Sequence, residues 1–232
     1  MAVAIITGAS KGLGRALAEV LAARGWDLVL DARGPEGLRE AAEGLEKYGT
    51  RVRALPGDVT DPGHRAELVG AARGLGGLGL LVNNAGVLGA EPLVPLDRHA
   101  LDAFRAALEV NVVAPLGLLQ EALPLLRSSP DGAVVNVSSD AAVEAYRTWG
   151  AYGATKAALD QLSAVLAVEE PELRVWWVDP GGMRTDMLAA AEPEEDLSVT
   201  PAPADVAPAF LRLLDRRPAS GRYTADALLE AR

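Results

Sequence analysis

Cysteine is absent from the 232-residue chain, and histidine occurs only twice. The lack of cysteine excludes disulfide bonds, thiolate nucleophiles and cysteine-ligated metal sites. Aromatic residues are also scarce at 4%, whereas half of the residues are apolar. This composition is typical of a globular protein whose core is packed with aliphatic side chains, and the length suits a single α/β domain.

Positive charge is in deficit, because 22 Lys and Arg residues stand against 32 Asp and Glu residues and give a net charge of −10. Nucleic acids and anionic membrane surfaces repel a polyanion, so neither is expected as a partner. No run approaches about 18 uninterrupted apolar residues, and residues 1–7 lack the basic segment of a signal peptide. We expect neither a membrane span nor secretion, and the cytoplasm is the default location.

Short apolar segments rich in Val, Ile and Leu alternate with longer segments of helical periodicity. The apolar segments are residues 2–7, 27–31, 51–55, 79–83, 133–138 and 174–179. Continuous apolar character of this kind indicates parallel strands that are buried on both faces. The pattern predicts a single doubly wound Rossmann-type α/β domain over residues 1–232, with a mainly parallel sheet flanked by helices on both faces. Residues 221–226 are a candidate for one further short strand.

A glycine-rich loop follows the first predicted strand and opens the first predicted helix. Its glycines are Gly8, Gly12 and Gly14. At that place, backbone N–H groups and the positive end of the helix dipole can bind a pyrophosphate. Glycines at such spacing also occur in a plain tight turn, but the position directly after an N-terminal strand favours a dinucleotide site.

Tyr152 and Lys156 are four residues apart at the start of a segment with helical periodicity, and Ser139 ends an apolar segment upstream. Residues i and i+4 share a helix face, so the ammonium can lie beside the phenol and lower its pKa. Taken alone, the pair also suits an amphipathic helix with a surface lysine. With Ser139, the three groups could act on one substrate oxygen, Tyr152 as general acid and Ser139 as a hydrogen-bond donor.

Further short motifs follow one another in a definite order. They are TGASKGLG at 7–14, Asp58 with Val59, NNAG at 83–86, Asn111, Ser139, YGATK at 152–156, and PG at 180–181 with Thr185. In this order of motifs the chain resembles the short-chain dehydrogenase/reductase family. Trp149 and the segments 166–171 and 180–187 are most similar to the sepiapterin reductase-like branch of that family.

The resemblance implies a nicotinamide dinucleotide cofactor and four catalytic residues, Ser139, Tyr152, Lys156 and Asn111. In this family the asparagine holds a water that links the lysine to solvent; without the other motifs, Asn111 would also suit an ordinary capping or core amide. The implied cofactor-binding residues are Gly8, Ser10, Lys11, Gly12, Leu13, Gly14, Arg33, Asp58, Val59, Asn84, Ala85, Gly86, Tyr152, Lys156, Pro180, Gly181 and Thr185.

The choice between NADP and NAD depends on the end of the second predicted strand, where a carboxylate would bind the ribose hydroxyls and repel a 2′-phosphate. By the resemblance, Ala32 takes the position of that carboxylate, and Arg33 and Lys11 can bind the phosphate. NADPH is therefore the expected cofactor, with NAD as the alternative. Asp31 would reverse the preference if the strand were shifted by one residue, but alternation along a strand should point its side chain away.

Substrate contacts are expected after the last motif and just before the catalytic helix. The candidates are Tyr146, Trp149, Met183, Met187 and Asp226, the last by a one-residue shift from an aspartate of the sepiapterin reductase-like branch. Residues 183–203, which include an acidic, proline-interrupted stretch, form either a solvated loop or a lid over the substrate. His64 and His99 lie outside every motif and are predicted to be surface residues, so no metal site is expected.

Together the motifs predict an NADPH-dependent carbonyl reductase that transfers a hydride to a ketone, diketone or pterin-like carbonyl. An NAD-linked alcohol dehydrogenase and a non-catalytic NADP-binding sensor or interaction protein are the alternatives. The chain lacks the longer glycine-rich tail that packs across a tetramer axis in many family members. A homodimer through residues 101–126 and 152–169 is therefore expected, with a monomer as the alternative.

Overall fold

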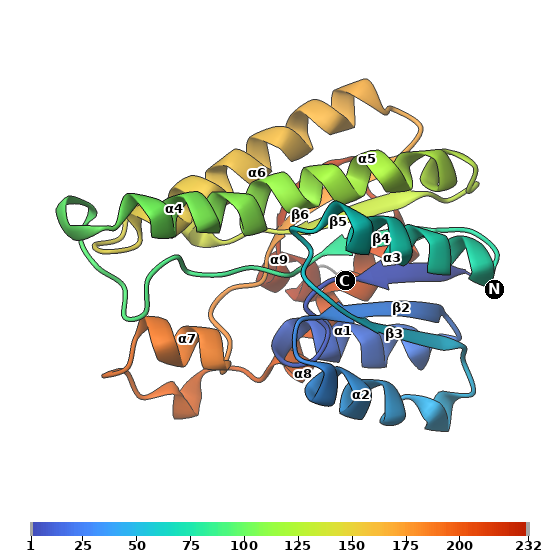
Figure 1. Ribbon diagram of the computed structural model, residues 1–232, viewed down its shortest axis with the longest axis horizontal. Coiled ribbons are helices and arrows are strands. Elements are labelled where there is room, and N and C mark those ends of the chain that lie inside the picture. Colours follow the sequence, from blue (N-terminus) through green and yellow to red (C-terminus); the bar gives the residue numbers. More distant parts are fainter. Residues whose placement is uncertain (1, 231–232) are drawn as a thin grey trace.

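The computed structural model describes residues 2–230, which form a seven-stranded parallel sheet between two layers of helices (Figure 1). The strands are β1 (Val3–Ile6), β2 (Asp27–Ala32), β3 (Val52–Pro56), β4 (Leu80–Asn83), β5 (Ala133–Val137), β6 (Arg174–Asp179) and β7 (Gly221–Thr224). Their order across the sheet is β3-β2-β1-β4-β5-β6-β7. The predicted doubly wound fold and its predicted strands are confirmed.

Each face of the sheet is covered by its own set of helices. One face carries α1 (Gly12–Ala22), α2 (Pro35–Glu43), α8 (Pro203–Arg216) and α9 (Ala225–Glu230). The other carries α3 (Pro62–Leu75), α5 (Ala114–Arg127) and α6 (Gly150–Glu169), with α4 (Leu101–Leu108) joined to α5 by a π-helical turn, Glu109–Val113. The short helix α7 (Asp186–Ala191) lies apart from both layers (Figure 1). Single 3₁₀ turns occupy Glu46–Tyr48, Leu96–Arg98, Asp140–Ala142 and Leu197–Val199.

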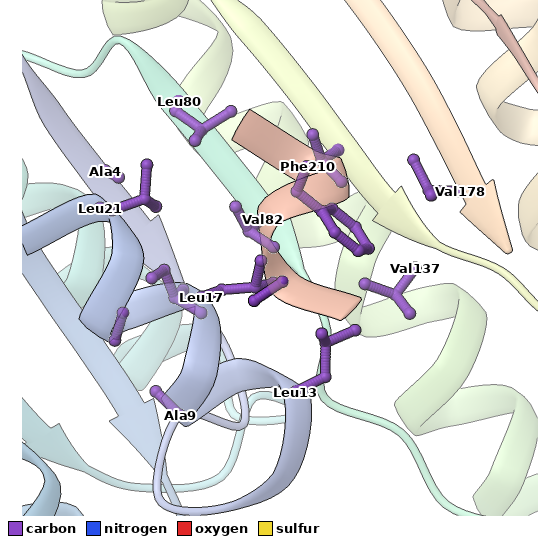
Figure 2. Close-up of a cluster of buried hydrophobic side chains, with 14 of the residues drawn as sticks. Ala4, Ala9, Leu13, Leu17, Leu21, Leu80, Val82, Val137, Val178 and Phe210 are labelled. Carbon is purple, nitrogen blue, oxygen red and sulfur yellow. The ribbon is translucent and has the colours of Figure 1, made fainter. Parts of the chain in front are cut away.

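The continuous apolar strands are explained by two cores, one on each face of the sheet. Successive side chains of a strand point to opposite faces, so Ile5 and Ile6 enter different cores and both are fully buried. Figure 2 shows the first core, where Leu17 of α1 and Phe210 of α8 pack over Val82 of β4. Burying one such side chain contributes about 1.5–3 kcal/mol, which is why these segments form strands at the centre of the molecule.

The strand order reverses between β1 and β4, because β1 leads to β2 on one side and β4 leads to β5 on the other. The loops that follow these two strands diverge to opposite faces of the sheet. In open α/β sheets the crevice between such loops, at the carboxyl ends of the strands, is where ligands bind. The fold therefore places the glycine loop at the edge of the sheet where a binding site is expected.

Within residues 2–230, one helical stretch, Leu101–Arg127, is long and apolar enough to cross a membrane by length and composition alone. The stretch comprises α4, the π-helical turn and α5. Its apolar side chains Leu118, Leu119 and Leu126 are buried in the second core. The packing of α5 against the sheet therefore accounts for much of this apolar character.

Candidate active site

A cleft of about 1250 Å³ lies at the carboxyl ends of the strands. It is lined by every predicted cofactor-binding residue except Gly14, and also by Ser139, Tyr146, Trp149, Met183 and Met187. Residues that lie far apart in the sequence are thus brought together in one site. The glycine loop and the catalytic helix α6 stand at this same cleft, as the resemblance implied.

The glycine loop is folded so tightly that side chains would prevent its closure. Gly8 and Gly12 have φ values of +66° and +58°, which strain residues other than glycine. A Cβ atom on Gly14 would lie 2.3 Å from the carbonyl oxygen of Gly8. Asn84, after β4, holds the loop in place, because its Nδ2 donates to the carbonyl oxygens of Thr7 (2.8 Å) and Gly8 (3.1 Å).

The first turn of α1 is left open for an anion. Its N-cap residue, Lys11, makes no side-chain capping hydrogen bond, and the turn contains no acidic residue. A Cβ atom on Gly12 would meet nothing closer than Thr185 Cγ2 at 3.6 Å. Because the first N–H groups of a helix lack intrahelical partners and carry the positive end of the dipole, this arrangement fits the pyrophosphate of a dinucleotide.

Tyr152 and Lys156 are both buried on α6, where they line the cleft. The Lys156 ammonium lies 5.6 Å from the centre of the Tyr152 ring and donates to the carbonyl oxygen of Val137 (2.8 Å). The Tyr152 ring packs edge-on against Trp149, with 5.6 Å between the ring centres. Both side chains are therefore fixed by packing and hydrogen bonding rather than free in solvent.

Ser139 follows β5 and caps the 3₁₀ turn Asp140–Ala142, since its Oγ accepts from Ala141 N at 3.2 Å. The hydroxyl donates to Asp140 Oδ1 at 3.0 Å. Gly153 lets α6 approach this turn, because a Cβ atom there would lie 2.4 Å from the Ala141 carbonyl oxygen. The glycine next to Tyr152 thus brings α6 and its phenol against the turn that carries Ser139.

Burial raises the pKa of Tyr152 well above its ordinary value, and the charges of Asp140 and Asp179 raise it further, whereas a hydrogen bond with Ser139 lowers it. The prediction of a lowered pKa is wrong, because the enclosure of the phenol outweighs the effects that favour its ionised form. The Lys156 ammonium is directed at the Val137 carbonyl. Burial in turn lowers the pKa of Lys156 to about 8, against a weaker opposing effect of Asp160.

A pH dependence follows from the pKa of Lys156. The ammonium is charged below about pH 8 and neutral above it, so its stabilisation of a developing phenolate is lost as the pH rises. We expect kcat/KM for carbonyl reduction to fall as the pH rises through about 8. The check is a rate profile with enzyme stability monitored at each pH. A flat profile from one unit below to two units above that value would contradict the role of Lys156.

Asn111 lies behind the cleft in the π-helical turn and is 1% exposed. Its Oδ1 accepts from Val87 N (2.9 Å), and its Nδ2 donates to Val87 O (2.8 Å) and Thr155 Oγ1 (2.9 Å). A Cβ atom on Gly86 would lie 3.3 Å from this amide and 3.7 Å from Lys156 Nζ. The side chain therefore joins the loop after β4 to α6 next to the lysine, and its proposed role in proton supply stays a prediction.

An ionic cluster next to the predicted catalytic residues was not found by sequence reasoning. Arg222 of β7 donates to Asp160 Oδ2 (3.2 Å), to Asp179 Oδ2 (3.4 Å) and to the carbonyl oxygen of Ser139 (3.0 Å). Asp179 also accepts from Gly181 N (3.0 Å). The guanidinium thus ties α6, the end of β6 and the Ser139 backbone together. In the sequence, the signal for this ionic cluster is the presence of charged residues inside otherwise apolar segments.

The predicted adenosine end of the cleft is formed by residues at and after the ends of β2 and β3. Ala32 and Arg33 line it together with Asp58, whose pKa is lowered chiefly by a backbone hydrogen bond from Thr60 and, to a smaller extent, by the positive charge of Arg33. The second predicted cation, Lys11, pairs with Asp186 of α7 at 2.7 Å, and both side chains are exposed. Arg33 is therefore the stronger candidate for binding a 2′-phosphate.

His64 is not a solvated surface residue, so that prediction is wrong, whereas His99 keeps part of its surface exposed. His64 is 6% exposed, and its Nε2 lies 2.7 Å from Asp31 Oδ1. His99 is half-buried, with its ring edge-on to Phe104. The His64 ring is enclosed by neighbours that sequence spacing does not reveal. Within residues 2–230, no group of three or more His, Asp or Glu side chains could hold a metal ion.

The predicted substrate end of the cleft is lined on one side by the segment that contains α7. Of the predicted substrate residues, Tyr146 donates to Asp140 Oδ2 at 3.0 Å, and Trp149, Met183 and Met187 line the cleft. Asp226 is the exception, because the chain turns into α9 directly after β7 and leaves this side chain exposed outside the cleft. The structure therefore removes Asp226 from the predicted substrate set.

The sheet, the glycine loop and the three polar side chains define a dinucleotide-binding oxidoreductase of the α/β class. The chain belongs to the short-chain dehydrogenase family, since the model of the family described as short chain dehydrogenase matches residues 2–196. Sepiapterin reductase of Xenopus laevis is 38% identical over 198 residues, which cover 81% of this chain and 75% of that protein. The uncharacterized oxidoreductase YciK of Escherichia coli is 34% identical over 215 residues, covering 90% of this chain and 84% of YciK.

Solved structures agree with this assignment. The structure of YciK matches with a TM-score of 0.90 and 33% identity, covering 97% of this chain and 94% of that one. A short chain dehydrogenase of Shigella flexneri, solved as a complex with NADP, matches with a TM-score of 0.90 and 32% identity, covering 97% of both chains. The predicted family and fold are thereby confirmed, and the chain is a short-chain oxidoreductase.

Proposed function

We propose that this oxidoreductase uses NADPH to reduce a ketone, diketone or pterin-like carbonyl compound. The observation that carries the proposal is the meeting of Ser139, Tyr152 and Lys156 with the glycine loop at one cleft. Burial raises the pKa of Tyr152, so the phenol stays protonated and has a proton to donate to a substrate oxygen. Similarity to sepiapterin reductases supports a pterin-like substrate among the candidates.

The chain's own residues would orient the substrate and manage the proton. The bound nicotinamide would supply the hydride. Ser139 Oγ would donate a hydrogen bond to the carbonyl oxygen in place of its bond to Asp140, and Tyr152 would transfer its proton to that oxygen. Lys156, fixed by Val137, would stabilise the phenolate left behind. The burial of Tyr152 excludes water and strengthens these interactions.

The proposed preference for NADPH rests on Ala32 and Arg33. Ala32 offers no carboxylate to bind ribose hydroxyls, and the Arg33 guanidinium can donate to a 2′-phosphate. We expect Arg33→Ala to weaken NADP⁺ binding about 10- to 100-fold, since hydrogen bonds between charged groups contribute about 1.5–3 kcal/mol. Binding of NAD⁺, which lacks the phosphate, should change less than about threefold by the same argument.

The measurement is titration of both cofactors by intrinsic fluorescence, with Arg73→Ala on α3 as the matched control. That exposed arginine does not line the cleft, so its removal should leave both affinities unchanged. Equal losses for NADP⁺ and NAD⁺ in Arg33→Ala would show that the 2′-phosphate is not bound there.

The proposed activity is tested by following NADPH consumption with a panel of diketones, quinones and pterins. The proposal predicts turnover of at least one of these classes, faster with NADPH than with NADH. Preferential use of NAD⁺ to oxidise alcohols would favour the alternative dehydrogenase. Cofactor binding without turnover in either direction would favour a non-catalytic NADP-binding protein.

We also propose that two copies pair through the outer faces of α5 and α6. Exposed apolar side chains support this, namely Val113 at the end of the π-helical turn, Leu116 on α5, and Val165 and Val168 on α6. A solution mass of twice 24.1 kDa is expected from light scattering, and the mass of a single chain would contradict it. The expectations of a cytoplasmic location and of no nucleic acid or membrane partner stay predictions from composition.

A further inference from the structure

A carboxylate lies at the adenosine end of the cleft although the proposed cofactor carries a phosphate there. Asp31 is the residue before Ala32 at the end of β2. Its carbonyl oxygen accepts from Ala9 N (2.8 Å), and its Oδ2 accepts a longer bond from Gly8 N (3.4 Å). The side chain is therefore directed under the glycine loop. A carboxylate that turned from there towards the ribose would favour NAD and repel a 2′-phosphate.

His64 encloses that carboxylate from the other side. It lies in the first turn of α3, and its Nε2 is 2.7 Å from Asp31 Oδ1. A carboxylate oxygen accepts, so Nε2 donates to it. The two side chains are only 6% and 2% exposed, so little water competes with this bond. Burial raises the pKa of Asp31, and the hydrogen bond from His64 is the largest of the effects that lower it again.

The position of the histidine ring depends on a glycine. A Cβ atom on Gly57, just after β3, would lie 2.3 Å from His64 Nδ1 and 2.6 Å from Cγ. Any other residue at position 57 would displace the ring from Asp31. On its outer side, Nδ1 lies 4.0 Å from the exposed carboxylate of Glu67. Three segments, the glycine loop after β1, the turn after β3 and the start of α3, thus combine to hold one carboxylate.

We infer that His64 is a positioning residue for cofactor choice, which holds the Asp31 carboxylate under the glycine loop and thereby leaves the ribose site free for the 2′-phosphate that Arg33 binds. This inference rests on the proposed preference for NADPH. His64 does not line the cleft, whereas Asp31 does, so the histidine acts through Asp31. The chain can therefore keep the acidic residue Asp31 directly before Ala32, the position at which a carboxylate would select NAD.

The test measures dissociation constants for NADP⁺ and NAD⁺ by fluorescence titration, which does not depend on turnover. In His64→Leu the carboxylate loses its side-chain donor and keeps only the longer bond from Gly8 N, and we expect the ratio of NADP⁺ to NAD⁺ affinity to fall about tenfold towards NAD⁺. His64→Gln retains an N–H donor and should keep the wild-type ratio. The double variant His64→Leu with Asp31→Asn should also recover that ratio, because no carboxylate is left to turn outward. A merely structural role of His64 predicts no such recovery.

The single variant Asp31→Asn tests the inference even if the His64→Leu variant does not fold. Because His64 already masks the charge, this change should alter the affinity ratio less than about threefold. A tenfold gain in NADP⁺ preference would mean that the cofactor senses the carboxylate despite His64, and would overturn the inference. An unchanged ratio in His64→Leu would overturn it too. The proposed cofactor preference is tested by the wild-type protein alone. Tighter binding of NAD⁺ than of NADP⁺ by the wild type would contradict that preference rather than the role of His64.

Discussion

Replacing Tyr152 with phenylalanine is expected to lower kcat for carbonyl reduction by about a thousandfold, within the range that general acids contribute. The ring of Tyr152 packs against Trp149, and phenylalanine preserves that packing while it removes the proton donor. Binding of NADPH should therefore stay within about threefold of the wild-type value. Single-turnover rates and cofactor titration on the same preparation measure both quantities.

The matched control is Tyr223→Phe on β7. Its hydroxyl donates to the Ala219 carbonyl at 2.8 Å, and it does not line the cleft. This variant loses the same oxygen atom elsewhere in the protein, so its turnover should stay close to wild type. If Tyr152→Phe kept more than about a tenth of wild-type kcat, an acid other than Tyr152 would have to protonate the product.

Gly14→Ala is expected to abolish tight binding of both cofactors, by about 100-fold or more. The new methyl group would lie 2.3 Å from the Gly8 carbonyl oxygen and 2.6 Å from Asn84 Nδ2, and the first of these contacts is with backbone. The loop must open to relieve the clash, at a cost in the upper part of the about 1–3 kcal/mol typical of overpacking. Because the loop holds the part that both dinucleotides share, the NADP⁺ and NAD⁺ affinities should fall together.

Gly70→Ala on α3 is the control for this second prediction. A Cβ atom there would meet no heavy atom within 4 Å, so the same chemical change is sterically free. Titration of both cofactors, with thermal unfolding as a check on the fold, compares the two variants. Cofactor affinity that survived in Gly14→Ala would show that the glycine loop does not hold the pyrophosphate.

The fold and the outline of the site could be predicted from sequence because they depend on local patterns. Strand β1 reads as a continuous apolar run, since Ile5 and Ile6 face two different cores. The glycine loop and the spacing of Tyr152 and Lys156 are likewise short-range signals. Such patterns survive in a linear sequence, and the elements they specify meet at the carboxyl end of the sheet.

What sequence could not supply is the pairing of side chains that lie far apart along the chain. His64 follows a polar turn and reads as a surface residue, yet it is buried because Asp31 offers an acceptor and Gly57 leaves space for the ring. Arg222 likewise acquires its place only when Asp160 and Asp179 converge on it. The direction of the Tyr152 pKa depends on the enclosure of the phenol, which spacing alone does not show.

The central claim is that hydride and proton are delivered to one carbonyl group beside Tyr152. The most direct test is reduction of a diketone from the panel with NADPH that carries deuterium at both C4 positions, in ordinary water, followed by mass spectrometry and NMR of the hydroxyketone product. The account predicts one deuterium on the carbinol carbon with the wild-type enzyme and almost no product with Tyr152→Phe. A reduced product without deuterium on that carbon, or equal product from the Tyr152→Phe variant, would contradict it.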